Sequence, residues 1–171
     1  RTRTDAACRW PARKISTEQQ AALDFVDLKT QYAALRESIN ARIQRVLDHG
    51  QYIMGPEVAE LEAALAERTA AAHCVTAASG TEALLIALLA LEVKPGDEVI
   101  TVSHSFIATA NAVRYCGATP VFVDIEPASY NIDPELIQPA ITPRTRAILV
   151  VHQIGMPCDL RRIVPIAARH G

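Results

Sequence analysis

The chain has 171 residues, 50% of them hydrophobic, and a formal net charge of −2 at pH 7. This length is enough for one domain with a substantial core. The nearly neutral charge excludes a protein that works mainly by electrostatic attraction to nucleic acid or to an anionic membrane. The longest apolar run, residues 83–91, is much shorter than the ~20 residues that span a bilayer, and it predicts a buried helix instead.

Cysteine usage gives a further bound on the class of protein. The chain has 4 cysteines, and no two of them form a CxxC pair, so neither a zinc knuckle nor a disulfide framework is predicted. We expect Cys74 and Cys116 to be small buried apolar residues of a protein kept reduced in the cytoplasm. No secretory apolar segment with a cleavage site is visible, which also favours a cytoplasmic location.

The first residues differ from the rest of the chain. Residues 1–20 contain four arginines but neither a starting methionine nor a clear apolar period. We interpret residues 1–22 as a disordered tail, an expression remnant or a mis-assigned upstream extension, and an arginine-rich arm that binds a partner is the alternative. Residues 23–171 then form the domain.

Two helices are expected next. Thr30 is the predicted cap of the first helix, Gly50 its left-handed terminator, and Pro56 the opening residue of the second helix. Both helices have apolar residues at helical spacing, which predicts one buried stripe on each. These residues are Leu35, Ile39, Ile43, Val46 and Leu47 in the first helix, and Val58, Leu61 and Leu65 in the second.

The rest of the chain alternates between short apolar runs and helical segments. Strands are predicted at residues 73–77, 98–102, 119–124 and 147–151. Four helices are predicted between and after these strands. The first runs from Ser79 to Leu91, and the second ends at about Cys116. The third starts at Asp133, and Asp159 is the predicted cap of the last one. This order predicts an α/β fold with a mainly parallel sheet flanked by helices on both faces.

The first candidate site is residues 78–84, between a predicted strand and a helix. Gly80 lets the backbone approach a ligand, and the amides at a helix N-terminus attract an anion such as phosphate. The Thr81 hydroxyl can add a hydrogen bond. The alternative is that Ser79 or Thr81 merely caps the helix.

Two further candidates follow predicted strands, where open α/β sheets bind their ligands. In residues 103–112, Phe106 can stack on a flat ring, although a core position is the alternative, and His104 is expected to be structural. In residues 151–159, His152 and Cys158 suggest a metal pair or a thiol–imidazole couple. No third ligand is near them in the sequence, and Gly155 and Pro157 favour a shaped loop, so no metal site is predicted.

Taken in order, these and other short motifs resemble those of the DegT/DnrJ/EryC1/StrS family of pyridoxal-phosphate-dependent sugar aminotransferases. The resemblance extends over nearly all of the chain from Phe25 onward, and the agreement in order is more specific than any single motif. The matching segments are residues 25–29, 50–58, 79–84, 95–100, 106–110, 117–125, 130–133 and 151–159.

The resemblance implies a fold and a set of roles. The fold is the N-terminal part of the large domain of a fold-type I pyridoxal-phosphate-dependent transferase. Gly80 and Thr81 would hold the phosphate of pyridoxal 5'-phosphate (PLP), and Phe106 would stack on its ring. Gly50 and Tyr52 would lie at the entrance for the nucleotide sugar, and residues 152–155 would lie beside the cofactor.

Catalysis in this family also needs a Schiff-base lysine and a carboxylate paired with the pyridine nitrogen. The lysines here are Lys14, Lys29 and Lys94, and none has the family's lysine position. The resemblance places both groups after Gly171, so we expect an N-terminal fragment that contains no catalytic residue and is inactive alone.

The implied activity is transfer of an amino group from glutamate to a keto sugar of a nucleotide sugar, by an enzyme that is a homodimer when full length. A dehydratase of the same family, with histidine in place of the lysine, is one alternative. A non-catalytic remnant or a regulatory domain is another. No nucleic-acid or membrane partner is expected.

Overall fold

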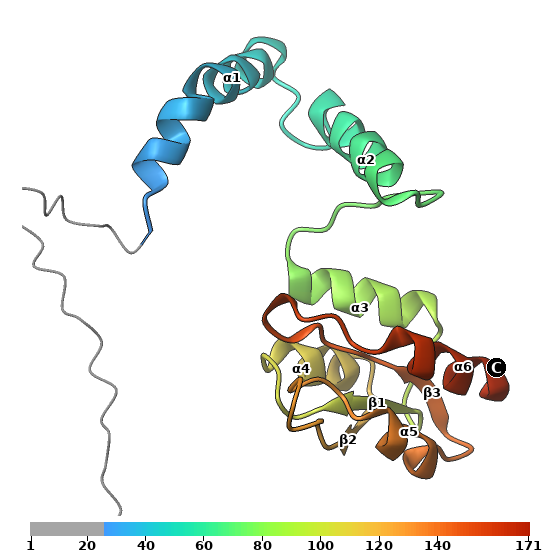
Figure 1. Cartoon of the computed structure of the whole chain (residues 1–171). Coiled ribbons are helices and arrows are strands. Elements are labelled where there is room, and N and C mark those ends of the chain that lie inside the picture. The colour runs from blue at the N-terminus through green and yellow to red at the C-terminus, as the bar shows by residue number, and fades with distance from the viewer. Residues whose placement is uncertain (1–25) are drawn as a thin grey trace, which may run out of the picture. The chain divides into compact units, whose positions relative to one another are not determined.

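The computed structural model describes residues 26–171, so the expectations for the N-terminal tail, Cys8 and Lys14 lie outside the described residues. The chain divides into two compact units, residues 1–59 and 60–171, and the division falls within the second helix. Each unit is described by itself, with the elements labelled as in Figure 1.

The first unit contains helix α1 (Leu28–His49) and the start of α2 (Pro56–Thr69). The predicted cap of α1 is wrong: Asp27, rather than Thr30, is the N-cap, because its carboxylate accepts a hydrogen bond from the Thr30 amide at 3.0 Å. The predicted terminator is confirmed. Gly50 has φ of +69°, and its amide donates to the Val46 carbonyl at 3.0 Å.

The apolar stripes of α1 and α2 are not buried as predicted. Neither helix has a buried residue, and Ile43, Leu47 and Leu61 are each about half exposed. Helical spacing predicts which residues share a face, but burial also requires a second layer against that face. The residues described in each unit provide no such layer for these stripes.

The second unit is built on a parallel sheet of three strands in the order β2-β1-β3. Its strands are β1 (Glu98–Val102), β2 (Thr119–Val123) and β3 (Thr145–Ile148). In the central register, Ile100 pairs with Val121 on one side and with Ile148 on the other. The first two strands lie where the sequence predicts them, whereas β3 begins two residues earlier and ends three residues earlier than expected.

The strand predicted at residues 73–77 is absent. Val75 is 79% exposed, and no described residue pairs with this segment as a strand. The amide and hydroxyl of Thr76 instead donate to the Glu62 carboxylate at 2.8 and 2.9 Å. A short apolar run becomes a strand only when a neighbour completes its ladder, and periodicity alone does not specify that neighbour.

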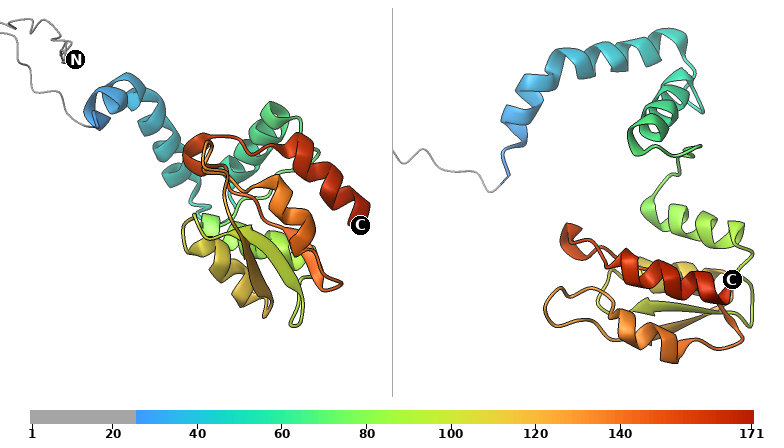
Figure 2. Two further views of the ribbon diagram at one scale, coloured as in Figure 1. Left: turned by 60° about the horizontal axis from the view of Figure 1, so that its bottom comes forward. Right: turned by 45° about the vertical axis from the view of Figure 1, so that its right-hand side comes forward.

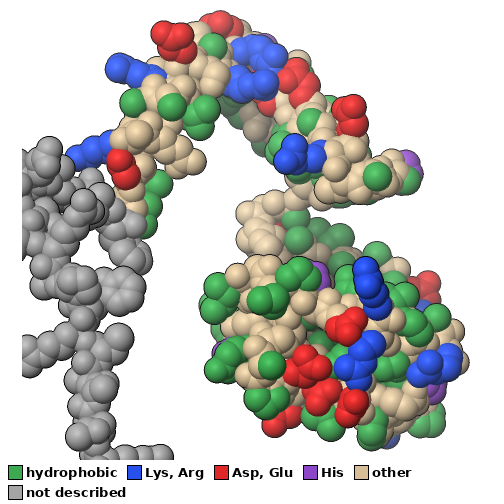
Figure 3. All heavy atoms as spheres, viewed as in Figure 1, with side chains coloured by type: hydrophobic (Ala, Val, Ile, Leu, Met, Phe, Trp, Pro, Cys, Tyr) green, Lys and Arg blue, Asp and Glu red, His purple; other side chains and the backbone are tan. Residues whose placement is uncertain are grey.

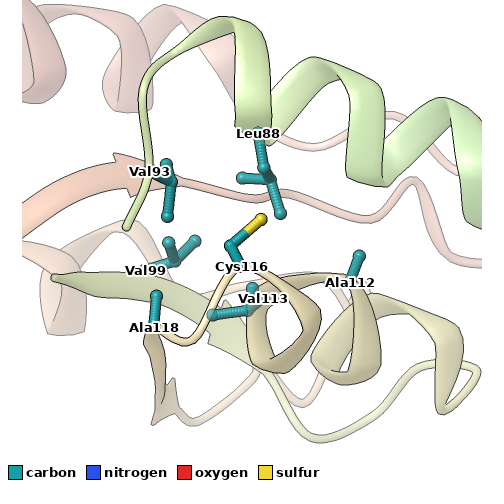
Figure 4. Close-up of a cluster of buried hydrophobic side chains, with 7 residues drawn as sticks. All are labelled: Leu88, Val93, Val99, Ala112, Val113, Cys116 and Ala118. Atoms are coloured by element: carbon teal, nitrogen blue, oxygen red, sulfur yellow. The ribbon is translucent and has the colours of Figure 1, made fainter. Parts of the chain in front are cut away.

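Helices cover both faces of the sheet, as predicted (Figures 1 and 2). Helices α3 (Gly80–Ala90) and α4 (Ala108–Tyr115) pack on one face, and α5 (Pro134–Ala140) and α6 (Leu160–His170) pack on the other. Side chains of the central strand alternate between the two layers, so that Val99 contacts the first pair of helices and Ile100 the second. Figure 4 shows the first cluster, in which Leu88 and Cys116 meet over Val99.

Helix α3 is less buried than its composition predicts. Only Leu88 is fully buried, Leu84 and Leu85 are half-buried, and Ile86 and Leu89 are half exposed. The helix contacts α4 and the sheet along one face, and no other layer in the described residues covers its opposite face. The prediction of a buried helix is therefore wrong for the face of α3 that is turned away from α4 and the sheet.

The surface agrees with the nearly neutral charge. Figure 3 shows acidic and basic side chains next to one another on the visible face of the second unit, with hydrophobic side chains among them. Within residues 26–171, none of the helices is both long and apolar enough to cross a membrane.

Candidate cofactor site

A hollow of about 560 Å³ in the second unit brings the three candidate motifs together. The N-terminus of α3, the loop after β1 and the loop after β3 each contribute side chains to its wall. Because β1 and β3 are parallel, their carboxyl ends meet at the same edge of the sheet, which is where such folds bind ligands. The lining residues are Gly80, Thr81, Leu84, Ser105, Phe106, Ala108, Thr109, Val151, His152, Gln153 and Ile154.

The N-terminus of α3 is suited to an anion. Ser79 is the N-cap, since its hydroxyl accepts a hydrogen bond from the Glu82 amide at 3.2 Å. This cap satisfies one of the first amides and leaves those of Gly80 and Thr81 without a partner among the described residues. A Cβ atom at Gly80 would have nothing within 4 Å, so the space in front of this backbone is open.

Phe106 is not a core residue. Its side chain is 76% exposed and lies on the wall of the hollow, so the alternative of a core position is contradicted. Hydrogen bonds hold the turn around it: the Thr109 amide donates to the Phe106 carbonyl at 3.0 Å, and the Ser105 and Thr109 hydroxyls bond each other at 2.7 Å. An exposed aromatic ring at a fixed position can stack on a flat ligand.

The loop after β3 is shaped by its own hydrogen bonds. The Cys158 amide donates to Nδ1 of His152 at 3.0 Å, so Nδ1 is an acceptor, and a neutral ring bears its proton on Nε2. The Cys158 thiol donates to the Val151 carbonyl at 3.0 Å, and burial raises the pKa of this thiol. A thiol–imidazole couple is therefore contradicted, because the imidazole bonds the Cys158 amide and the thiol stays protonated.

Two other features belong elsewhere. His104 does not line the hollow; its ring lies beside that of Tyr130 with centroids 5.8 Å apart, at a neighbouring depression of about 440 Å³ that shares Gln153 and Ile154 with the hollow. A further hollow of about 470 Å³ lies along the outer edge of β3 and contains none of the motif residues. Within the described part of the chain, no three His, Cys, Asp or Glu side chains group as metal ligands.

The profile of the DegT/DnrJ/EryC1/StrS aminotransferase family matches residues 33–171. The chain belongs to this family. A relative from Pseudomonas aeruginosa, named UDP-2-acetamido-2-deoxy-3-oxo-D-glucuronate aminotransferase, is 52% identical over 87% of this chain and 42% of its own length. The chain spans about 40% of the length of the curated relatives that it matches.

Solved structures of the DegT/DnrJ/EryC1/StrS family confirm the fold. The crystal structure of S. venezuelae DesV is 46% identical, with a TM-score of 0.84 over 87% of this chain and 40% of that one. The structure of NtdA from Bacillus subtilis, described with bound cofactor PMP, is 42% identical, with a TM-score of 0.76 over 78% of this chain and 31% of that one. The predicted α/β architecture of a fold-type I transferase is thereby confirmed.

The remaining residues predicted from the family resemblance lie in the first unit. Gly50 ends α1, and Tyr52 is 67% exposed in the turn that follows. A polar cluster holds this turn: Arg45 Nε donates to Glu57 at 2.8 Å, and Nδ1 of His49 accepts from the Gln51 amide at 3.0 Å. The role of Gly50 and Tyr52 at a substrate entrance stays a prediction.

The described lysines do not contribute to the hollow. Lys29 is exposed in the first turn of α1, and Lys94 is exposed in the turn before β1. Neither is among the residues that line it.

One residue at this edge of the sheet was missed by sequence analysis. Asn131 is 3% exposed and bonds the backbone of the loop after β3, more than 20 residues away in sequence. The sequence around it predicts a helix start at Asp133, and residues 130–133 match the family, but a single asparagine gives no signal for a distant partner. Only the fold shows that it contacts the site.

Proposed function

We propose that the protein is a PLP-dependent aminotransferase that transfers an amino group from glutamate to a keto sugar carried by a nucleotide. The observation that supports this most directly is the hollow itself, which unites a helix N-terminus with unpaired amides, an exposed aromatic ring and a polar loop. Membership of the family and the printed name of the Pseudomonas aeruginosa relative support the choice of reaction.

The residues fit the cofactor by size and by donor chemistry. A hollow of about 560 Å³ is within the range of about 300–1,000 Å³ typical of small-molecule sites. The amides of Gly80 and Thr81 would bind the phosphate, favoured by the partial positive charge of the α3 N-terminus. Phe106 would pack against the ring, and Leu84 and Ala108 supply the apolar part of the wall.

When bound, PLP supplies an electron-withdrawing ring that stabilises negative charge on the substrate carbon. The chain's own contribution is to hold and orient it. The loop after β3 presents His152, whose Nδ1 is already bonded, so that Nε2–H of the neutral ring is its free donor. We propose that the lysine of the reaction comes from a part of the protein outside residues 1–171.

The remaining elements of the proposal concern the whole protein. We infer a homodimer, as the family resemblance implies, that works in the cytoplasm, as the cysteine usage favours. The substrate class is a nucleotide-linked keto sugar, and the product is the corresponding amino sugar. A dehydratase of the same family would eliminate water from a related sugar without consuming an amino donor, so the two reactions differ in what they use and release.

The test uses the protein expressed from its complete reading frame. Addition of PLP should change the visible absorbance, and Thr81→Val should weaken PLP binding about tenfold, since it loses one hydrogen bond to a charged group. Thr119→Val, at the exposed amino end of β2, is the matched control and should bind as the wild type does.

Turnover is then measured with glutamate and a UDP-linked keto sugar. Release of 2-oxoglutarate together with an amino sugar is the expected result. Loss of water from the sugar with no use of glutamate would favour the dehydratase, and absence of PLP binding would reject both enzymes.

A further inference from the structure

Asn131 makes three side-chain hydrogen bonds to the loop after β3. Its Oδ1 accepts from the Gln153 amide at 3.0 Å, and its Nδ2 donates to the carbonyls of Met156 and Pro157, both at 3.1 Å. The orientation of the amide is unambiguous on chemical grounds, because a flipped group would set NH₂ against an N–H and an oxygen against two carbonyls.

The backbone of Asn131 is anchored to the segment that follows β2. Its carbonyl accepts from the Glu126 amide at 2.9 Å, and its amide donates to the Ser129 hydroxyl at 3.3 Å. The neighbouring Ile132 forms an antiparallel bridge with Ile125 and is 1% exposed in the core. The side chain of Asn131 therefore extends from a backbone that is held in place by hydrogen bonds.

The loop that Asn131 holds has a backbone conformation that is costly for its sequence. Ile154, in the short 3-10 helix η2 (Gln153–Gly155), has φ of +50° and ψ of +32°. A left-handed conformation costs about 1–2 kcal/mol per residue in L-amino acids, and a β-branched side chain adopts it rarely. Ile154 is 98% exposed, so packing of its own side chain does not offset this cost.

The three hydrogen bonds enclose the strained residue. Gln153 precedes Ile154, and Met156 and Pro157 follow it, so Asn131 fixes the chain on both sides of the turn. Gln153 and Ile154 both line the hollow, whereas Asn131 does not. Backbone strain of this kind is typical of functional sites, where surrounding contacts maintain it.

We infer that Asn131 is a positioning residue for the cofactor site, which acts by holding residues 152–154 at the wall of the hollow. The inference rests on the proposed function, because the proposed function identifies PLP as the ligand of the hollow. A purely structural role would lower stability and leave the PLP affinity of the folded protein unchanged. If Asn131 has a positioning role, its substitution weakens PLP binding even under conditions where the variant is fully folded.

The experiment compares Asn131→Ala and Asn131→Asp with the wild type, using the protein expressed from its complete reading frame. We expect Asn131→Ala to weaken PLP binding about tenfold, as measured by absorbance titration well below the unfolding temperature. Asn131→Asp retains the acceptor for Gln153 but sets a carboxylate oxygen against two carbonyls, so it should bind at least as weakly.

A second readout does not depend on any ligand. Amide hydrogen exchange at Gln153 should become faster in Asn131→Ala, since the acceptor of this amide is lost. Thr142→Val is the matched control: it removes a hydroxyl that donates to Glu98 at the opposite end of the sheet, and it should lower stability without changing PLP affinity.

The outcomes separate the inference from the proposed function. Wild-type PLP binding with unchanged affinity in Asn131→Ala would overturn the inference alone. Unchanged exchange at Gln153 in that variant would also overturn it. Failure of the wild type to bind PLP would reject the proposed function and with it the inference.

Discussion

The two ends of the parallel sheet use polar groups in opposite ways. At the amino end, Glu98 opens β1 with 6% exposure, and its carboxylate accepts from the Thr142 hydroxyl at 2.5 Å and from Arg144 Nε at 3.0 Å. At the carboxyl end, Phe106 and Ile154 are 76% and 98% exposed beside the open N-terminus of α3. The Glu98 carboxylate at the first end is satisfied within the protein, whereas the Gly80 and Thr81 amides and the Phe106 ring at the second end are available to a ligand.

This difference shows how one sheet separates stability from binding. Hydrogen bonds at the amino end connect β1 to the residues before β3. At the carboxyl end, backbone amides have no hydrogen-bond partner and an aromatic ring is exposed. This lowers local stability unless a ligand fills the hollow. Changes at the two ends should therefore affect different measurements.

The largest expected effect is on stability at the amino end. Gly117, in the turn before β2, has φ of +76°, and an added Cβ would lie 2.7 Å from Cγ of Pro95. Gly117→Ala combines the cost of a left-handed alanine with a steric clash, and we expect a loss of about 2–3 kcal/mol in the free energy of unfolding. Urea denaturation measures it, and PLP affinity should not change.

Gly96→Ala is the control for that prediction. Gly96 has φ of +95°, but an added Cβ would have nothing within 4 Å, so only the conformational cost of about 1–2 kcal/mol remains. Equal losses in the two variants would show that the contact with Pro95 contributes nothing.

The next effect is on binding at the carboxyl end. Phe106→Ala should weaken PLP binding about tenfold, because aromatic stacking contributes about 0.5–1.5 kcal/mol beyond the area that it buries. Since Phe106 is 76% exposed, the free energy of unfolding should change by less than about 0.5 kcal/mol. Absorbance titration and urea denaturation of the same samples measure both quantities.

Phe122→Ala is the matched aromatic control. Phe122 is 51% exposed on β2 and does not line the hollow, so its removal should leave PLP affinity unchanged. A similar loss of affinity in both variants would remove the special role of Phe106.

The sequence predicts local features of this molecule well. Gly50, Pro56 and Asp159 mark helix ends by backbone geometry or capping, which depend on a few neighbouring residues, and all three predictions are confirmed. The strand at residues 98–102 is confirmed because its apolar run is bounded by a turn and by polar residues. The loops after β1 and β3 also meet in one hollow, since parallel strands direct successive loops to the same edge, and the N-terminus of α3 lines the same hollow without a strand before it.

Features that depend on distant partners were not predictable. Whether residues 73–77 form a strand depends on a neighbouring strand, and whether α3 is buried depends on a second layer, neither of which is encoded in the segment itself. The role of Asn131 was not predictable either, because its hydrogen-bond partners lie in the loop after β3, more than 20 residues away in the sequence. For Phe106, the sequence left two interpretations open, and exposure in the folded chain decided between them.

The smallest expected effect concerns the pH dependence of the amino end. Hydrogen bonds from Thr142 and from Arg144 hold the pKa of Glu98 below its ordinary value of 4.5. The folded state therefore prefers the carboxylate, and the resulting stability is fully present above the unfolded pKa and is lost as pH falls through the folded pKa. Arg144 is 67% exposed, so the contribution of this pair should be smaller than the effect of Gly117→Ala.

Glu98→Gln tests this contribution, because glutamine retains an acceptor for Thr142 but has no charge to titrate. The variant should be less stable than the wild type at pH 7, and the gap should narrow as pH falls below about 4.5, the ordinary pKa of the carboxyl group. Urea denaturation across this pH range measures the gap. Glu135→Gln, a surface carboxylate paired with Arg162, is the control and should change stability little at any pH. A gap for Glu98→Gln that stays constant down to low pH would mean that the buried carboxylate stabilises by shape rather than by charge, and the two ends of the sheet would then differ less than their hydrogen bonds indicate.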